Sequence, residues 1–273
     1  MANEEEREFF YRASAVAFGT QITSPEPGAA ENQAAASLPT TGGLGRAQVG
    51  SYSHPSGLAS FAGASSEVRG TLHPDGKTHD TLAKVIVDDL NIMNVVRAVK
   101  VVVQLETIQP PDSYEIDARL DVKFENLRIL GDLVEPVPHP ELLDKTTFSA
   151  LEDAYEKADS PFVDRHGKPF RLPRRAAIRQ HTSAITGGNG ATFPCFEDRI
   201  LVTSLFQEFA VPTTPPLRSV GGCVHVPGFG RICLGQLIIT CSSRRFEAIV
   251  CKLGSPQQGR LVFGSVEGNG SRG

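Results

Sequence analysis

Several features that would assign a protein to a class are missing from this chain. Tryptophan is absent, only two methionines occur among 273 residues, and no apolar run approaches the roughly 18 residues needed to cross a bilayer. The first residues are acidic and contain neither a basic segment nor an uninterrupted apolar core, so they lack the pattern of a secretory signal. On this basis we expect no membrane span and a cytoplasmic location.

Familiar catalytic and phosphate-binding motifs are also missing. No Gly-x-Ser-x-Gly segment occurs, which removes the usual strand-to-helix serine nucleophile. Two glycine-rich segments, 42–45 and 187–190, are followed neither by the Lys-Ser or Lys-Thr of a phosphate loop nor by the helix of a dinucleotide site. We interpret both as turns and expect no cofactor. The net charge of −4 makes nucleic acid an unfavourable partner.

The cysteines allow two interpretations. There are five, an odd number, and no two have Cys-x-x-Cys spacing, which argues against a zinc knuckle or a thioredoxin-type motif. We interpret them as buried free thiols in strands, in keeping with a reducing compartment. The other interpretation is a thiol nucleophile, because one cysteine follows two glycines and precedes a histidine by two positions. Cys223 and His225 are therefore the candidate catalytic residues.

The most regular pattern in the chain runs from Tyr114 to Glu125. Apolar and charged residues alternate there without a break, and this period of two predicts a strand with one buried face and one wet face. The phase changes at Asn126, as at a β-bulge. The preceding run, 84–108, predicts a second strand and a hairpin, since Pro110 and Pro111 mark the turn between the two. Its buried face is expected to carry Val99, Val101, Val103 and Leu105.

The C-terminal third repeats this rhythm. Segments 231–241, 246–253 and 260–266 are strand-like and separated by links of turn length, which predicts an antiparallel meander. Near the start, 12–23 is a further candidate strand. Alternation stops between about 140 and 192, where residues 144–158 form an amphipathic helical pattern with Ser149 and Glu152 spaced as a capping box. We therefore divide the chain into a first β half (1–135), an insertion (136–192) and a second β half (193–273) that completes the same core.

Two charged clusters invite a chemical interpretation. Two histidines and an aspartate around the Pro-Asp-Gly at 74–76 could ligate a metal, although an exposed turn is the competing interpretation; the candidate ligands are His73, Asp75 and His79. The carboxylates of Glu115, Asp117 and Asp121 share one strand face, as paired glycosidase acids would. Arg119 and Lys123 share that face too, which favours a solvated surface of mixed charge.

The insertion also carries a basic arm. Its cations could pair with the acidic residues at the start of the chain, and only two aromatic residues accompany them. Docking to protein, within or between subunits, is therefore favoured over binding of nucleic acid. The residues predicted to bind a partner are Arg165, Lys168, Arg171, Arg174, Arg175 and Arg179.

Short apolar and glycine-rich motifs carry a family resemblance. Ala13-Ser-Ala-Val-Ala-Phe-Gly19, Leu38-Pro-Thr-Thr-Gly-Gly43, Phe124-Glu-Asn-Leu-Arg-Ile-Leu-Gly131, Val226-Pro-Gly-Phe-Gly-Arg-Ile232 and Gly268-Asn-Gly270 resemble uncharacterised bacterial β-rich proteins of, or near, the choice-of-anchor group of cell-surface proteins. The resemblance spans both β halves and skips the insertion. It implies an extracellular β unit held at the envelope, whereas this sequence has neither a recognisable signal nor an anchor, and it brings no catalytic residue.

Together these patterns predict an all-β protein, an antiparallel sandwich or flattened barrel with one helix-containing insertion. We expect a non-enzymatic structural or scaffold protein that self-associates, as a homo-oligomer or with another protein, because strand edges are templates for pairing. The alternative is a β-barrel that binds or acts on a small apolar ligand, lined by Phe61, Phe124, Phe206, Phe209 and Phe229. An enzyme that uses Cys223 and His225 remains open.

Overall fold

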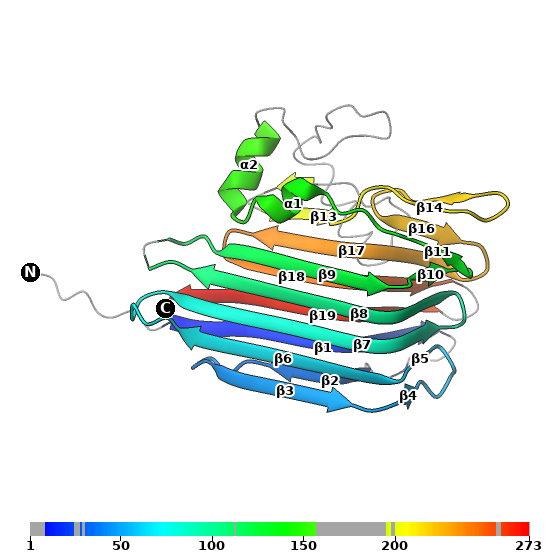
Figure 1. Cartoon of the computed structure of the whole chain (residues 1–273), viewed down its shortest axis with the longest axis horizontal. Helices are drawn as coiled ribbons and strands as arrows, with labels where there is room; N and C mark the ends of the chain where they lie inside the picture. Colours follow the sequence, from blue (N-terminus) through cyan, green and yellow to red (C-terminus); the bar gives the residue numbers. More distant parts are fainter. Residues whose placement is uncertain are drawn as a thin grey trace, which may run out of the picture.

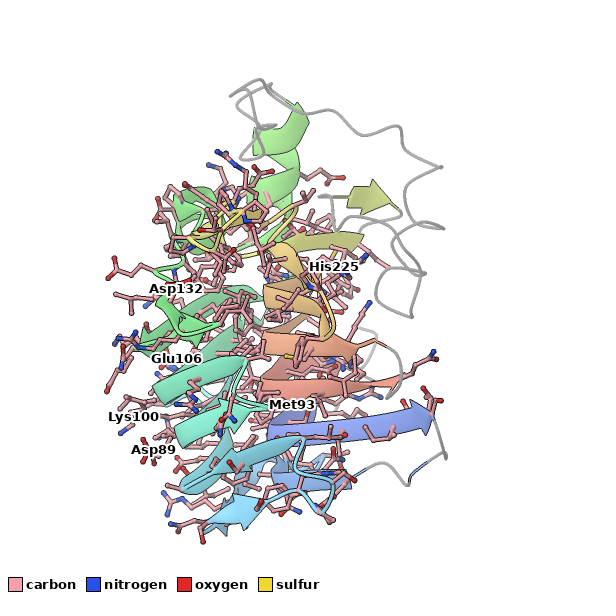
Figure 2. The ribbon with its side chains drawn as sticks, turned by 90° about the vertical axis from the view of Figure 1, so that its right-hand side faces the viewer. Asp89, Met93, Lys100, Glu106, Asp132 and His225 are labelled. Atoms are coloured by element: carbon pink, nitrogen blue, oxygen red, sulfur yellow. A yellow bond between two sulfur atoms is a disulfide. The ribbon has the colours of Figure 1, made fainter. Side chains whose placement is uncertain are left out.

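The computed structural model describes residues 9–24, 28, 31–111, 113–156, 195–197, 200–254 and 258–272. Two antiparallel sheets pack face to face, and within these residues neither sheet closes into a barrel (Figure 1). Figure 2, turned by 90°, shows the sheets as two layers. The predicted all-β sandwich is confirmed, and the flattened barrel is not observed. No helix in this part of the chain is long and apolar enough to cross a membrane.

One layer, sheet A, combines the first two strands with those of the C-terminal third. Its central order is β13-β17-β18-β19-β1-β2, and β19 pairs with β1 along almost its whole length, from Phe9 opposite Arg272 to Ser24 opposite Gln258. The strands are β1 (Phe9–Ser24), β2 (Glu31–Ser37), β12 (Cys195–Glu197), β13 (Ile200–Ser204), β16 (Cys223–Val226), β17 (Gly230–Thr240), β18 (Ser243–Leu253) and β19 (Gln258–Arg272).

The other layer, sheet B, is built from consecutive strands around the long hairpin β7–β8. Its strands are β3 (Gly43–Val49), β4 (Tyr52–Ser53), β5 (Ala59–Phe61), β6 (Gly63–Leu72), β7 (His79–Ile92), β8 (Val96–Gln109), β9 (Asp117–Glu125), β10 (Arg128–Ile129) and β11 (Asp132–Leu133). A small separate ribbon is formed by β14 (Ala210–Val211) and β15 (Leu217–Arg218). The first β half therefore contributes to both layers, since β1 and β2 belong to sheet A.

The core lies between the layers, where long strands such as β6, β7 and β8 bury alternate side chains. Phe18 of β1 is its aromatic centre. Its ring centroid lies 4.7 Å from that of Phe263 in sheet A and 6.3 Å from that of Phe61 in sheet B. Burying one such side chain contributes about 1.5–3 kcal/mol, so β1 helps to hold the two layers together.

A crease crosses both sheets and shifts the alternation of every strand that it meets. At the crease, one residue on each of two neighbouring strands is left out of the pairing, and the same pairing register resumes beyond it. These residues are Ala17, Ala34, Gly235, Ala248 and Gly264 in sheet A and Asp89 and Val99 in sheet B. Four of the seven, Ala34, Asp89, Gly235 and Gly264, have positive φ angles of 46°, 51°, 65° and 66°. The crease lets both ends of each strand keep their apolar residues facing the core.

The crease corrects one prediction about β8. Val101, Val103 and Leu105 are buried as expected, but Val99 is 47% exposed. Strict alternation placed all four residues on one face, whereas the phase shift opposite Asp89 turns Val99 to the solvent. Asp89 and Lys100, which flank this position, lie on the outer side of sheet B in Figure 2.

The predicted hairpin of β8 and β9 and the meander β17–β18–β19 are both observed. Within the hairpin, strand β9 starts later than expected. Tyr114 is 83% exposed, and β9 begins only at Asp117, because the Ser113 hydroxyl accepts a hydrogen bond from the Glu115 backbone N–H and holds the preceding residues in a turn. The phase change at Asn126 is confirmed: its φ is 53°, and Leu127 and Ile129 are buried beyond it.

The helical part of the insertion contains α1 (Pro140–Asp144) and α2 (Phe148–Glu156). Phe148 and Leu151 are buried, as the amphipathic pattern requires. The predicted capping box is wrong. The N-cap is Thr147, whose Oγ1 accepts from the Ala150 N–H at 3.3 Å, whereas Ser149 lies within the helix and donates to the carboxylate of Glu115. A tertiary contact thus takes the polar side chain that the sequence pattern assigned to capping.

Candidate functional site

The outer edge of β9 is an open hydrogen-bonding surface at one side of sheet B. β9 pairs with β8 on one side, and on the other side the Ala118 N–H donates to the Thr146 carbonyl at 3.0 Å. Backbone groups alternate between the two sides of an antiparallel strand, so those of Leu120, Val122 and Phe124 point the same way as that of Ala118. These three have no backbone partner on that side within the described part of the chain.

An apolar groove of about 370 Å³ runs beside this edge. Its floor includes Leu120, Val122 and Phe124, which are half-buried, and the Phe124 ring centroid lies 5.7 Å from that of Phe206. The side chains are only half covered because β9 is the last long strand of its sheet. An added strand would therefore find both unpaired backbone groups and apolar surface.

The far wall of the groove is the connector between β11 and α1. It is attached to the opposite layer, since the His139 N–H donates to the Leu205 carbonyl and the Gln207 N–H donates to the Val137 carbonyl, each within 2.8 Å. Figure 1 shows α1 beside β9 at this side of the sandwich. The connector therefore leaves the edge of β9 open between Thr146 and β11.

The segment that follows α1 is anchored by charged groups. Glu115 accepts hydrogen bonds from the backbone N–H and hydroxyl of Ser149 at the N-terminus of α2, where a negative charge is stabilised by the helix dipole. Arg244, which is 4% exposed, donates to the Thr146 carbonyl at 3.1 Å and also to the Thr240 carbonyl. Burial lowers the pKa of Arg244 to about 10, with the nearby carboxylates acting in the opposite direction. Glu115 thus has a structural role at the helix end.

The wet face of β9 alternates in charge. Arg119, Asp121, Lys123 and Glu125 are exposed, and the Lys123 ammonium lies 3.0 Å from the Asp121 carboxylate. Exposed pairs of this kind contribute little to stability, about 0–1 kcal/mol. Their alternating charges instead favour a neighbouring strand that places opposite charges across from them.

The candidate nucleophile is engaged elsewhere. Cys223 and Cys233 face each other across β16 and β17 and form a disulfide, with Cα atoms 4.0 Å apart. The expectation of free thiols is therefore wrong for these two, while Cys241 and Cys251 are free. The sequence did not predict this disulfide because the two cysteines are ten residues apart and no local pattern links them. The register of the β16–β17 hairpin places them side by side. His225 is exposed and lies opposite Arg231 (Figure 2). The argument for a reducing compartment assumed free thiols, and it does not apply to Cys223 and Cys233.

The candidate metal ligands have separate partners. His73 Nε2 lies 2.5 Å from the Asp80 carboxylate. The Asp75 carboxylate accepts hydrogen bonds from the Thr78 hydroxyl and from the backbone N–H groups of Thr78 and Lys77 within its own turn, and these bonds lower the pKa of Asp75 to about 2. The ring of His79 stacks on Phe9, and its Nδ1 lies 2.8 Å from the Tyr11 hydroxyl. No group of three ligand-type side chains that could hold a metal occurs in the described part of the chain.

The remaining predicted residues fall into two groups. The basic arm lies outside the described residues, so its partner-binding role stays a prediction. Of the five phenylalanines proposed to line an apolar pocket, Phe124 and Phe206 line the groove beside β9, whereas Phe61 packs in the core against Phe18 and Tyr52. Pro138 of the connector and Leu143 of α1 were missed, because no local pattern indicates that they will lie beside β9.

Comparison with known proteins gives one match. The model of a family described as "Domain of unknown function (DUF8256)" matches residues 9–240. No curated protein and no solved structure matches the chain. The resemblance to the choice-of-anchor group stays a prediction, because the family description does not mention that group.

Proposed function

Because the chain belongs to this family, whose description states no activity, we propose from the geometry alone that it is a non-enzymatic structural protein that self-associates through β9. In the proposed dimer, β9 of one protomer pairs antiparallel with β9 of a second copy about a two-fold axis. Isologous contacts of this kind are the commonest in homo-oligomers. The open edge of β9 beside an apolar groove is the observation that carries the proposal.

Charge complementarity selects the register. With the two-fold axis at Val122, Asp121 lies opposite Lys123 of the second copy, and Arg119 lies opposite Glu125. Each cross-strand pair of opposite charge contributes roughly 0.2–1 kcal/mol. On the other face, Leu120 lies opposite Phe124, so apolar side chains extend the floor of the groove.

The neighbouring registers are less favourable. An axis at Asp121 would place like charges opposite each other at every charged position. An axis at Leu120 would also match charges, but it would require Ala118 to pair, and its N–H already donates to Thr146. The register at Val122 uses residues 119–125 and leaves that hydrogen bond intact.

Exchanging charges along β9 tests the proposal. Asp121→Lys and Lys123→Asp each place like charges opposite each other twice in the dimer, so each should weaken dimerisation roughly tenfold or more. The double variant D121K/K123D has the composition of the original chain and should restore dimerisation. The measurement is size-exclusion chromatography with light scattering over a range of concentrations.

Two outcomes would remove the proposal. The first is a monomer at every concentration. The second is a dimer that all three variants leave unchanged. A deletion of residues 160–185 in the same assay separately tests the predicted role of the basic arm.

A second function, binding of a small apolar ligand, is favoured by the groove lined by Phe124 and Phe206. Pockets of about 300–1,000 Å³ accommodate such ligands. Mass spectrometry of the purified protein before and after denaturation should then detect a released apolar compound.

A further inference from the structure

A second and larger groove lies on the outer face of sheet A, away from β9. It has a volume of about 810 Å³ and is lined from β1, β13, β17, β18 and β19. Gln236 and Glu247 point away from the core because they alternate with buried core residues: Gln236 precedes Leu237, and Glu247 follows Phe246. The open face of a sheet is thus hollowed around polar side chains.

At its centre is one buried carboxylate held by two arginines. Glu247 is only 5% exposed, and its Oε1 accepts from Arg245 at 2.9 Å while its Oε2 accepts from Arg260. Both oxygens are therefore occupied, and the two guanidinium groups are fixed in position. Charge-assisted bonds of this kind are strong and directional.

Positive charge exceeds negative charge in the groove. Lys252 lies opposite Arg260 in the ladder, so Lys252, Arg260 and Arg245 face the single carboxylate of Glu247. The Lys252 Nζ and the Arg260 Nε are buried, and neither has a hydrogen-bond partner among the described residues. Donors buried without a partner are costly, and these two lie on adjacent strands of the same groove.

The electrostatic environment of Lys252 shows the same imbalance. Burial, followed by the charges of Arg231 and Arg260, lowers the pKa of Lys252 to about 8, while Glu247 acts in the opposite direction. An anion beside Lys252 would offset both causes, because it would supply an acceptor and neutralise the clustered cations.

The rest of the lining is uncharged. Thr23, Gln21 and Gln236 bring hydroxyl and amide groups to the same hollow, and Val202 and Ile238 bring apolar ones. Hydroxyl and amide groups donate to and accept from hydroxyls. The volume is that of a site for a small molecule.

We propose that this groove binds a small anionic ligand with a hydroxyl-rich body, whose acidic group, a carboxylate or a phosphate, lies between Lys252 and Arg260. The inference does not depend on dimerisation, since β9 belongs to the other sheet.

Titration calorimetry on the full chain tests the proposal with glucuronate, glucose 6-phosphate, inorganic phosphate and glucose. At least one of the three anions should bind, and neutral glucose, which shares the sugar body, should bind at least tenfold more weakly than the better acidic sugar. Whichever of glucuronate and glucose 6-phosphate binds more tightly shows whether the groove prefers a carboxylate or a phosphate. Absence of binding by all three anions, or equal binding of glucose, overturns the proposal.

Variants locate the site. Lys252→Met keeps most of the side-chain length and removes the ammonium, so affinity should fall about tenfold or more without a lower Tm, because an unpaired buried charge is lost. Lys84→Met on sheet B removes the same charge at a distance and should leave affinity unchanged. Equal loss in both variants would show attraction by net charge only and would overturn the assignment.

The pH dependence gives an independent readout. The charged groups facing Lys252 are Arg231 on β17, Arg245 and Glu247 on β18, and Arg260 on β19. Affinity of the original chain should decline between pH 7 and 9 as Lys252 loses its proton, and the Lys252→Met variant should lose this decline. An equal decline in both would contradict the placement of the acidic group.

Discussion

Lys252 illustrates at the scale of a single residue how position changes chemistry. Its ordinary pKa of 10.5 falls to about 8 in the folded chain, so between these values the unfolded chain binds more protons than the folded one. Stability therefore rises with pH across that interval and is lost again as the pH falls through 8. Urea unfolding at pH 8 and pH 10 should show a larger gain for the original chain than for Lys252→Met. Equal gains would contradict the shifted pKa.

The cysteines carry a second prediction at this scale. Thiol labelling of the denatured protein should detect two more thiols after reduction than before it, because Cys223 and Cys233 are joined. Replacing both by serine should lower the free energy of unfolding by about 2–3 kcal/mol, as expected for a loop of this length. Equal labelling before and after reduction would show that the pair is open.

Single residues also mark the limit of sequence reasoning. The burial of Val101 and Val103 followed from alternation, because it depends only on the direction of neighbouring side chains. The disulfide and the groove around Glu247 could not be predicted in this way. Glu247 and Arg260 are separated by a turn and by the register of β18 and β19, and nothing in either strand alone indicates that they meet.

At the scale of elements, the crease is the feature that simple periodicity does not anticipate. It crosses β17, β18, β19, β1 and β2 at consecutive positions, so the shift in one strand is matched by its neighbours. Glycines with positive φ at 235 and 264 permit this backbone conformation. The sequence therefore predicted where strands occur, whereas the change of phase within a strand could be recognised only from the pairing of neighbouring strands in the sheet.

Gly264→Ala tests the crease. A Cβ there would lie 3.0 Å from Val103 Cγ2 and 3.1 Å from Ala248 Cβ, at a φ of 66°. We expect a loss of about 2–4 kcal/mol in the free energy of unfolding, from backbone strain and crowding together. Gly50→Ala is the control, since a Cβ there meets nothing within 4 Å and φ is not positive. Similar small effects from both substitutions would refute the packing described for the crease.

At the scale of the whole molecule, β1 connects the parts. Its Phe18 contacts aromatic rings from both layers, so Phe18→Ala should cost about 3–5 kcal/mol. Because one core joins the two β halves, far-UV circular dichroism and tyrosine fluorescence should report a single coincident unfolding transition in the original chain and in the variant. Two separate transitions would indicate that the halves fold independently.

The pairing of β1 with β19 has a further consequence for biosynthesis. Thr23 and Gln258 are hydrogen-bonded although they are 235 residues apart along the chain. During translation, β1 leaves the ribosome long before its main partner exists, and only β2 can pair with it in the meantime. The pairing that joins β1 to the C-terminal strands must therefore wait until β19 has emerged, and the free side of β1 stays exposed during that interval.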